Sequence, residues 1–270
     1  MRTAALAAAL LPTIVFAGCF QSNVLVKVNA DGSGSIETQT LLTSAAVAQV
    51  QQLSGAFGGG KPVELFSEQQ ARDVGARMGE GVTMVSTRAL KTADAEGREA
   101  IYAFQDVTKV HISQTPDAPG GGSLRAGGLG LGQGEAMTIA LSRNAAGNMV
   151  LTFHIGANLL GSLANQTGAG DASRGMPLPA DQIAMMQPLL AGMRLALRVQ
   201  PAGRLITTTS PYVDGNVVTL LDLDLDTLLA DPAFKDLQTA KTSQEVKDDL
   251  KRIRGIKLNL DPDISLEFAP

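Results

Sequence analysis

The stretch VLVKVNADGSGSIETQT, residues 24–40, decides the fold class of this chain. Apolar and polar positions alternate on both sides of Asp31-Gly32, a pattern typical of two antiparallel strands joined by a tight turn. We therefore predict a β-hairpin with strands at 23–29 and 35–42.

Capping patterns outside this hairpin predict helices between further strands. Ser67 and Gln70 form a capping box, followed by an apolar helical stripe of Ala71, Val74 and Met78. The predicted helices span 44–54, 67–79 and 242–255, with further ones around 183–190 and after Asp231-Pro232. The predicted strands lie at 82–90, 99–112, 135–143, 148–155, 193–200, 204–210, 216–224 and 263–268.

Hairpins that follow one another, with helices between them, favour an α+β fold built on antiparallel sheet. Residues 118–134 contain eight glycines and predict a flexible loop that could separate two subdomains. The two halves do not differ in composition, so we expect a single domain over residues 19–270.

The composition excludes several functional classes. The chain has 270 residues, of which 44% are hydrophobic and 18% charged, so it can build a core and is not a disordered protein. A net charge of −4 gives no basic field for nucleic acid. One Cys and two His leave no disulfide, no thiolate cluster and no zinc set, and we predict no cofactor.

The N-terminus predicts export and lipid anchoring. Arg2 precedes a short apolar run at 4–17, which is typical of a signal peptide covering residues 1–18. Phe16-Ala17-Gly18-Cys19 then resembles the lipobox of bacterial lipoproteins, in which the Cys receives a diacylglyceryl group whose acyl chains are typically palmitate. We expect Cys19 to anchor the protein to a membrane of the cell envelope, facing the periplasm or the cell surface. Phe20 after it favours the outer over the inner membrane.

Two glycine-rich stretches imitate nucleotide-binding loops without the required context. GAFGGGK at 55–61 is followed by Pro62, where a phosphate loop needs a hydroxyl, and it comes after a helix instead of a strand. GLGQG at 130–134 has no preceding strand–helix unit. We interpret both as turns or linkers.

Asp222, Asp224 and Asp226 alternate with leucines and offer a possible cation site if the strand continues that far. The preferred interpretation is a solvated strand face that leads into a helix capped by Asp226. His111 and His154 lie in strand-like runs with no carboxylate at ligand spacing, which favours a structural role for both.

Methionines surround one apolar helical stretch. Met185, Met186 and Met193 lie in or beside it, next to a glycine-rich segment, and adaptable Met side chains could line a lipid pocket. Ordinary core packing accounts for the same residues and is the preferred interpretation.

Two segments carry a family resemblance. The hairpin at 26–34 just after a lipobox, and RVQPAGRLIT at 198–207 followed by YVDGNVVTL at 212–220, resemble the LppM-like group of bacterial lipoproteins. Leu220 stands where that group tends to have an aromatic residue, and the C-terminal transmembrane helix frequent in that group is not found. The resemblance implies an envelope lipoprotein with an α+β domain and affinity for lipids, and it transfers no catalytic residue.

Three hypotheses for function follow. The first is a non-enzymatic, membrane-anchored lipoprotein that binds an amphiphile or lipid. The second is an interaction module of an envelope protein assembly, with a solid core and an exposed apolar patch. The third is an unrecognised hydrolase, whose residues would converge only in three dimensions.

Overall fold

The computed structural model describes residues 20–48, 51, 64–112, 137–154, 192–233, 243–259 and 261–270. The strands are β1 (Phe20–Val28), β2 (Gly34–Thr43), β3 (Thr83–Lys91), β4 (Ala95–Phe104), β5 (Thr138–Arg143), β6 (Met149–His154), β7 (Arg194–Pro201), β8 (Leu205–Thr208), β9 (Val213–Asp214), β10 (Val217–Asp224), β11 (Ile256–Leu258) and β12 (Asp263–Phe268). The helices are α2 (Glu68–Arg77), the 3₁₀ turn η1 (Val107–Lys109), α5 (Leu225–Ala230) and α7 (Ser243–Arg252).

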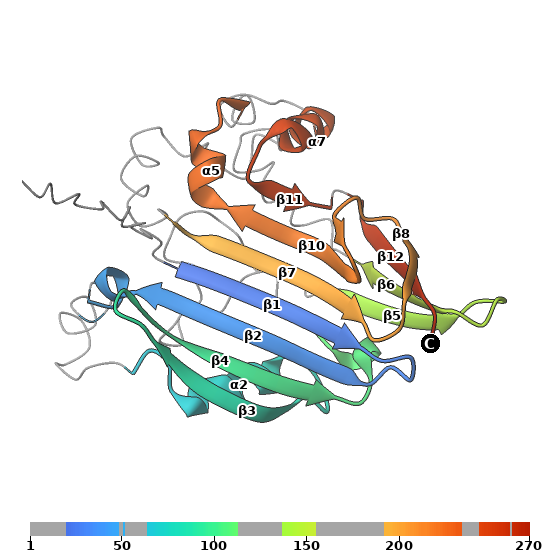
Figure 1. Cartoon of the computed structure of the whole chain (residues 1–270), viewed down its shortest axis with the longest axis horizontal. Coiled ribbons are helices and arrows are strands. Elements are labelled where there is room, and N and C mark those ends of the chain that lie inside the picture. Colours follow the sequence, from blue (N-terminus) through green and yellow to red (C-terminus); the bar gives the residue numbers. More distant parts are fainter. Residues whose placement is uncertain are drawn as a thin grey trace, which may run out of the picture.

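These strands form two sheets. The large sheet has the order β11-β10-β7-β1-β2-β4-β3, with β9 added to β10, and the small sheet has the order β5-β6-β12-β8. In Figure 1 the large sheet crosses the picture and the small sheet lies toward its right-hand end. The fold is therefore mixed α+β, as the hairpin pattern predicts.

One pairing departs from the predicted antiparallel arrangement. β1 pairs in parallel with β7 over almost its whole length, from Gln21 opposite Arg194 to Val28 opposite Pro201. A second departure follows it, because β8 leaves β7 and pairs with β12 in the small sheet. β7 instead takes β10 as its antiparallel neighbour.

The local predictions around the first hairpin and α2 are confirmed. β1 and β2 pair in register across the turn, with Val28 opposite Gly34. Gly32 has a φ of +87°, a backbone conformation that L side chains rarely adopt. Ser67 and Gln70 form the expected reciprocal capping box at the start of α2. The Tyr102 hydroxyl donates to the Ala71 carbonyl at 2.9 Å and holds α2 against β4.

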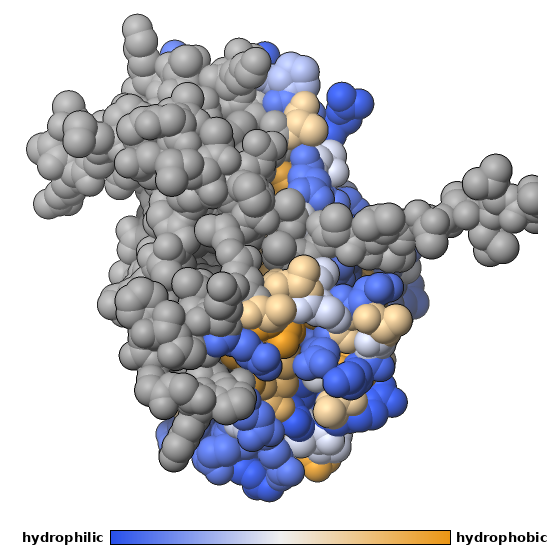
Figure 2. All heavy atoms as spheres, turned by 90° about the vertical axis from the view of Figure 1, so that its left-hand side faces the viewer, coloured by the Kyte–Doolittle hydropathy of each residue, from blue (hydrophilic) through white to orange (hydrophobic). Residues whose placement is uncertain are grey.

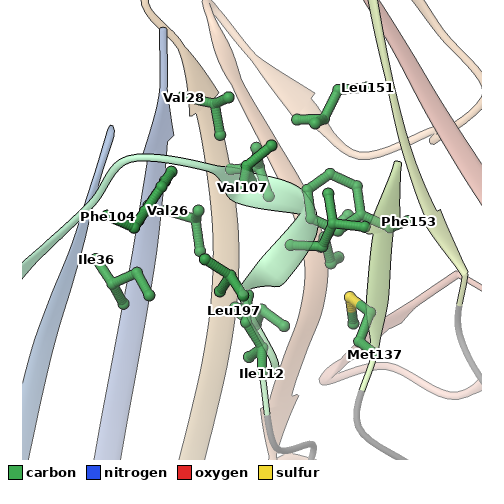
Figure 3. Close-up of a cluster of buried hydrophobic side chains, with 14 of the residues drawn as sticks. Val26, Val28, Ile36, Phe104, Val107, Ile112, Met137, Leu151, Phe153 and Leu197 are labelled. Carbon is green, nitrogen blue, oxygen red and sulfur yellow. The ribbon is translucent and has the colours of Figure 1, made fainter. Parts of the chain in front are cut away.

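The main core lies between the two sheets. Figure 3 shows η1 placing Val107 between side chains of the large sheet, such as Val26, and side chains of the small sheet, such as Phe153. All three of these side chains are completely buried. Burying a Phe or Val side chain contributes roughly 1.5–3 kcal/mol to the free energy of folding. Because the cluster takes side chains from both sheets, it packs the two sheets together.

A second apolar cluster lies at the opposite end of the large sheet, where β1 begins. Phe20 and Leu42 face each other across β1 and β2, and Met193 and Leu195 join them from the start of β7. The cluster is completed by Leu225 and Leu228 of α5, by Leu250 of α7, and by Ile253 directly after α7.

Several predictions fall outside the described residues. These are the signal peptide at 1–18, Cys19, the phosphate-loop imitation at 55–61, the glycine-rich loop at 118–134, the stretch at 130–134 within it, the helix around 183–190, and Met185 and Met186.

Candidate functional surfaces

The predicted lipidation site adjoins the first described residue. Phe20 follows Cys19 directly, begins β1, and is only 5% exposed within the second cluster. Met193 lies in the same cluster, and its backbone carbonyl accepts a hydrogen bond from the Leu225 amide at 3.0 Å. Met193 is therefore a packed core residue, and the predicted ligand contact of the three methionines stays a prediction.

We use "anchor end" for the described residues at this end of the large sheet. They are the start of β1, residues 44–48 after β2, the β3–β4 turn at 92–94, and residues 192–194 at the start of β7. Figure 2 views the molecule from this side, and the coloured atoms visible there are mostly hydrophilic, with fewer hydrophobic ones among them. Lys91 Nζ donates a hydrogen bond to Glu96 Oε1 at 2.8 Å, and this bond raises the pKa of the Lys91 ammonium.

The three alternating aspartates have separate structural roles. β10 ends at Asp224, whose carboxylate accepts from the Thr227 amide at 3.0 Å and caps α5. The prediction of Asp226 as the cap is wrong, because the chain turns into the helix two residues earlier. Asp226 accepts instead from the Gly192 amide at 2.7 Å.

Asp222 is not part of a solvated strand face, because it is only 9% exposed. Its carboxylate lies 3.5 Å from Arg194 Nε and 3.4 Å from Arg198 Nη2 on the neighbouring strand β7. One carboxylate shared by two guanidinium groups leaves excess positive charge at this point of the sheet. This arrangement suits an ion-pair network and argues against a cation site.

His154 gains a partner that its sequence neighbours do not provide. The register of β6 and β12 places it opposite Asp263, and its Nδ1 lies 2.6 Å from Asp263 Oδ1. Both side chains are about half exposed, at 49% and 61%. His111 is exposed elsewhere, and its backbone amide donates to the Met78 carbonyl at 2.7 Å. Within the described ranges, no three His, Cys, Asp or Glu side chains gather in a way that could hold a metal ion.

The turns at the other end of the large sheet form a hydrogen-bonded surface, which we call the loop end. It comprises the turns at 29–33, 144–148, 201–204 and 214–216, seen on the right in Figure 1. Asn216 connects two of these turns. Its Nδ2 donates to the carbonyls of Pro201 and Gly203 at 2.6 and 2.9 Å, and its Oδ1 accepts from the Leu205 amide at 2.7 Å.

One local motif occurs both in the loop-end turn at 29–33 and at residues 106–108. Asp31 accepts from the hydroxyl and the amide of Ser33, and Asp106 accepts likewise from Thr108. These hydrogen bonds to side-chain hydroxyls and backbone amides lower the pKa of both carboxyls. The Val107 amide donates to the Gly32 carbonyl at 2.8 Å, so the two motifs are held together. Sequence reasoning found the first turn and missed this connection, which depends on a long-range contact.

Comparisons with known proteins give one weak likeness. No protein-family model and no curated protein matches the sequence. The NMR structure of the folded domain of LppM from Mycobacterium tuberculosis is similar over 93% of this chain and 90% of that chain, with 7% identity and a TM-score of 0.32. The resemblance is thus at the level of the fold alone. Across the ranges that the structure describes, no helix has the length and apolarity needed to cross a bilayer.

Proposed function

We propose that this chain is a lipid-anchored, non-enzymatic protein of the bacterial cell envelope that presents a binding surface. The observation that carries the proposal is the order of features at the N-terminus. A signal-like apolar run ends in Ala17-Gly18-Cys19, and strand β1 begins at the next residue, Phe20. A cut before Cys19 would keep every strand and helix that the structure describes and would place the thiol on the first residue.

The anchoring part of the proposal is tested by Cys19→Ser. Each buried methylene of an acyl chain contributes about 0.8 kcal/mol, so two chains hold a protein on a membrane stably. Cys19→Ser should abolish incorporation of radiolabelled palmitate and release the protein from membranes, whereas the control Gly18→Ala should leave both unchanged. Membrane attachment of Cys19→Ser equal to that of the parent chain would refute lipidation at this residue.

The geometry supports best an interaction module for another envelope component, with the loop end as the binding surface. Its turns are held by side-chain hydrogen bonds, as at Asn216, so binding would cost little ordering entropy. A rigid scaffold with loops gathered at one end is a common arrangement for recognition.

Site-specific photo-crosslinking in cells tests this surface. A photoreactive side chain at exposed Ala145 or Ala202 should give one defined adduct, and the same group at Ala93 of the anchor end should not. Adducts of equal yield at all three positions, or at none, would contradict the use of the loop end.

Binding of an amphiphile is a second candidate, and it would require the second apolar cluster at the anchor end, now packed by its own side chains, to open around the ligand. Phe20, Met193 and Leu195 meet there beside the residue that would carry the lipid. Native mass spectrometry of the protein extracted in mild detergent should then show a retained lipid beyond the acyl groups on Cys19. A mass equal to the acylated polypeptide alone would eliminate this candidate and leave the interaction module.

A further inference from the structure

The position of the first residue of β1 bears on the orientation of the domain relative to a bilayer. We infer that the anchor end of the large sheet rests against the lipid headgroups and that the loop end is held away from them. This inference rests on the proposed acylation of Cys19 and adds the orientation of the domain and the surface that meets the lipid.

No residue lies between the predicted lipidation site Cys19 and strand β1, which begins at Phe20. Consecutive Cα atoms are about 3.8 Å apart, so Phe20 lies within one residue of the acylated position. Phe20 is already buried and is paired with Leu42, the residue opposite it in β2. The next residue, Gln21, is paired with Arg194 of β7 on the other side. The strand that carries the anchor is therefore fixed on both sides from its first residues.

The direction of β1 determines which end of the large sheet lies near the anchor. The strand runs from the anchor end to the loop end, and its nine residues span about 26 Å at roughly 3.3 Å per residue. Residues 44–48 and the turn at 92–94 lie beside its start, because Thr43 is opposite Ala95. The turns at 29–33 and 201–204 lie beside its end, because Val28 is opposite both Gly34 and Pro201.

The chemistry of the anchor end suits contact with lipid headgroups. The exposed side chains at the anchor end include Ser44, Ala45, Thr92, Ala93 and Asp94, which are small or polar. The large apolar side chains that are exposed in the described part of the chain lie elsewhere, on β3, β8 and β9. Among the described residues, this surface fits hydrated headgroups and exposes no bulky apolar side chain that would insert into the hydrocarbon.

The test uses the full acylated protein in phosphatidylcholine–phosphatidylglycerol vesicles that contain a nitroxide-labelled headgroup. The chain has a single Cys, and acylation converts its thiol into a thioether, so an engineered Cys is the only reactive thiol. Four exposed alanines provide matched label sites: Ala45→Cys and Ala93→Cys at the anchor end, and Ala145→Cys and Ala202→Cys at the loop end. Each variant is labelled with a bimane fluorophore.

We expect the nitroxide to quench the two anchor-end labels several-fold more strongly than the two loop-end labels. A control variant carries about ten Gly-Ser residues between Cys19 and Phe20, a linker that reaches roughly 17 Å as a flexible coil, and it should remove most of that difference.

Three outcomes separate the possible failures. Equal quenching at all four sites of the parent chain would overturn the inferred orientation. A difference that persists with the linker would show that surface affinity, and not the short tether, sets the orientation. An intact mass without acyl groups on Cys19 would instead refute the proposed function, and it is measured before the vesicles are made.

Discussion

Removing the Asn216 side chain should loosen the loop end selectively. Asn216→Ala deletes three hydrogen bonds of 2.6 to 2.9 Å and leaves two backbone carbonyls and the Leu205 amide without that partner. A neutral hydrogen bond contributes about 1 kcal/mol net, and the site is only partly buried, so we expect the free energy of unfolding to fall by about 2–3 kcal/mol. Urea unfolding followed by circular dichroism measures this change.

A second substitution at the same position tests the direction of these bonds. Asn216→Asp keeps the acceptor for Leu205 but places a carboxylate oxygen against the carbonyls of Pro201 and Gly203. At neutral pH, Asn216→Asp should have a lower free energy of unfolding than Asn216→Ala. Acidification should reduce this difference between the two variants, because a protonated carboxyl can donate a hydrogen bond. Asn23→Ala is the control, since its amide makes one long contact of 3.5 Å to Gln39, and we expect a loss below about 0.5 kcal/mol. If Asn216→Ala cost no more than Asn23→Ala, the reasoning about the turn network would be wrong.

Three further predictions concern the core, one close backbone approach and acid stability. Phe153→Ala removes a fully buried ring between the sheets and should lower the free energy of unfolding by about 3–5 kcal/mol, measured by thermal melting. The control Val85→Ala, at a position 65% exposed, should change the free energy of unfolding little in the same measurement. Gly97→Ala places a Cβ 2.0 Å from the Thr40 carbonyl oxygen, so it should lower Tm steeply or abolish the cooperative melt; an unchanged Tm would contradict this contact. The pKa of Asp106 is lower in the folded state than the ordinary Asp value of about 3.9, so its carboxylate stabilises the fold above that value. This stabilisation is lost as the pH falls through the lower folded-state pKa. Asp106→Asn should therefore show a smaller drop in Tm from pH 5 to pH 2 than the parent chain.

Local chemistry made much of the fold predictable. The turn at Asp31-Gly32 and the capping box at Ser67 depend on neighbours within a few residues, so the sequence alone specifies them. Strand positions followed from alternation, because side chains on one face of a sheet must be buried together. The last strand, predicted at 263–268, is found with those bounds.

Long-range pairing could not be predicted in the same way. The alternation of Val24, Val26 and Val28 fits an antiparallel neighbouring strand as well as it fits β7, which is parallel. No nearby residue distinguishes the parallel from the antiparallel pairing. The contact of His154 with Asp263 is invisible for the same reason, since 109 residues separate them. The error at Asp226 is of another kind, because Asp224 and Asp226 are both good caps and only the end of β10 decides between them.

The position of β1 also limits how far the connection between a lipid at Cys19 and the folded domain could lengthen by fraying of the strand. Each residue that frays from β1 would add roughly 3.3 Å, so bringing the loop end to the bilayer would require unpairing most of the strand. Releasing Phe20 alone already exposes an aromatic ring, at a cost of about 1.5–3 kcal/mol. Continuing to Val26 and Val28, both completely buried, would open the main core and unfold the protein. β1 has β7 on one side and β2 on the other, so it cannot peel away as an edge strand can. If Cys19 is acylated as proposed, we therefore expect the domain to keep this orientation for as long as it stays folded.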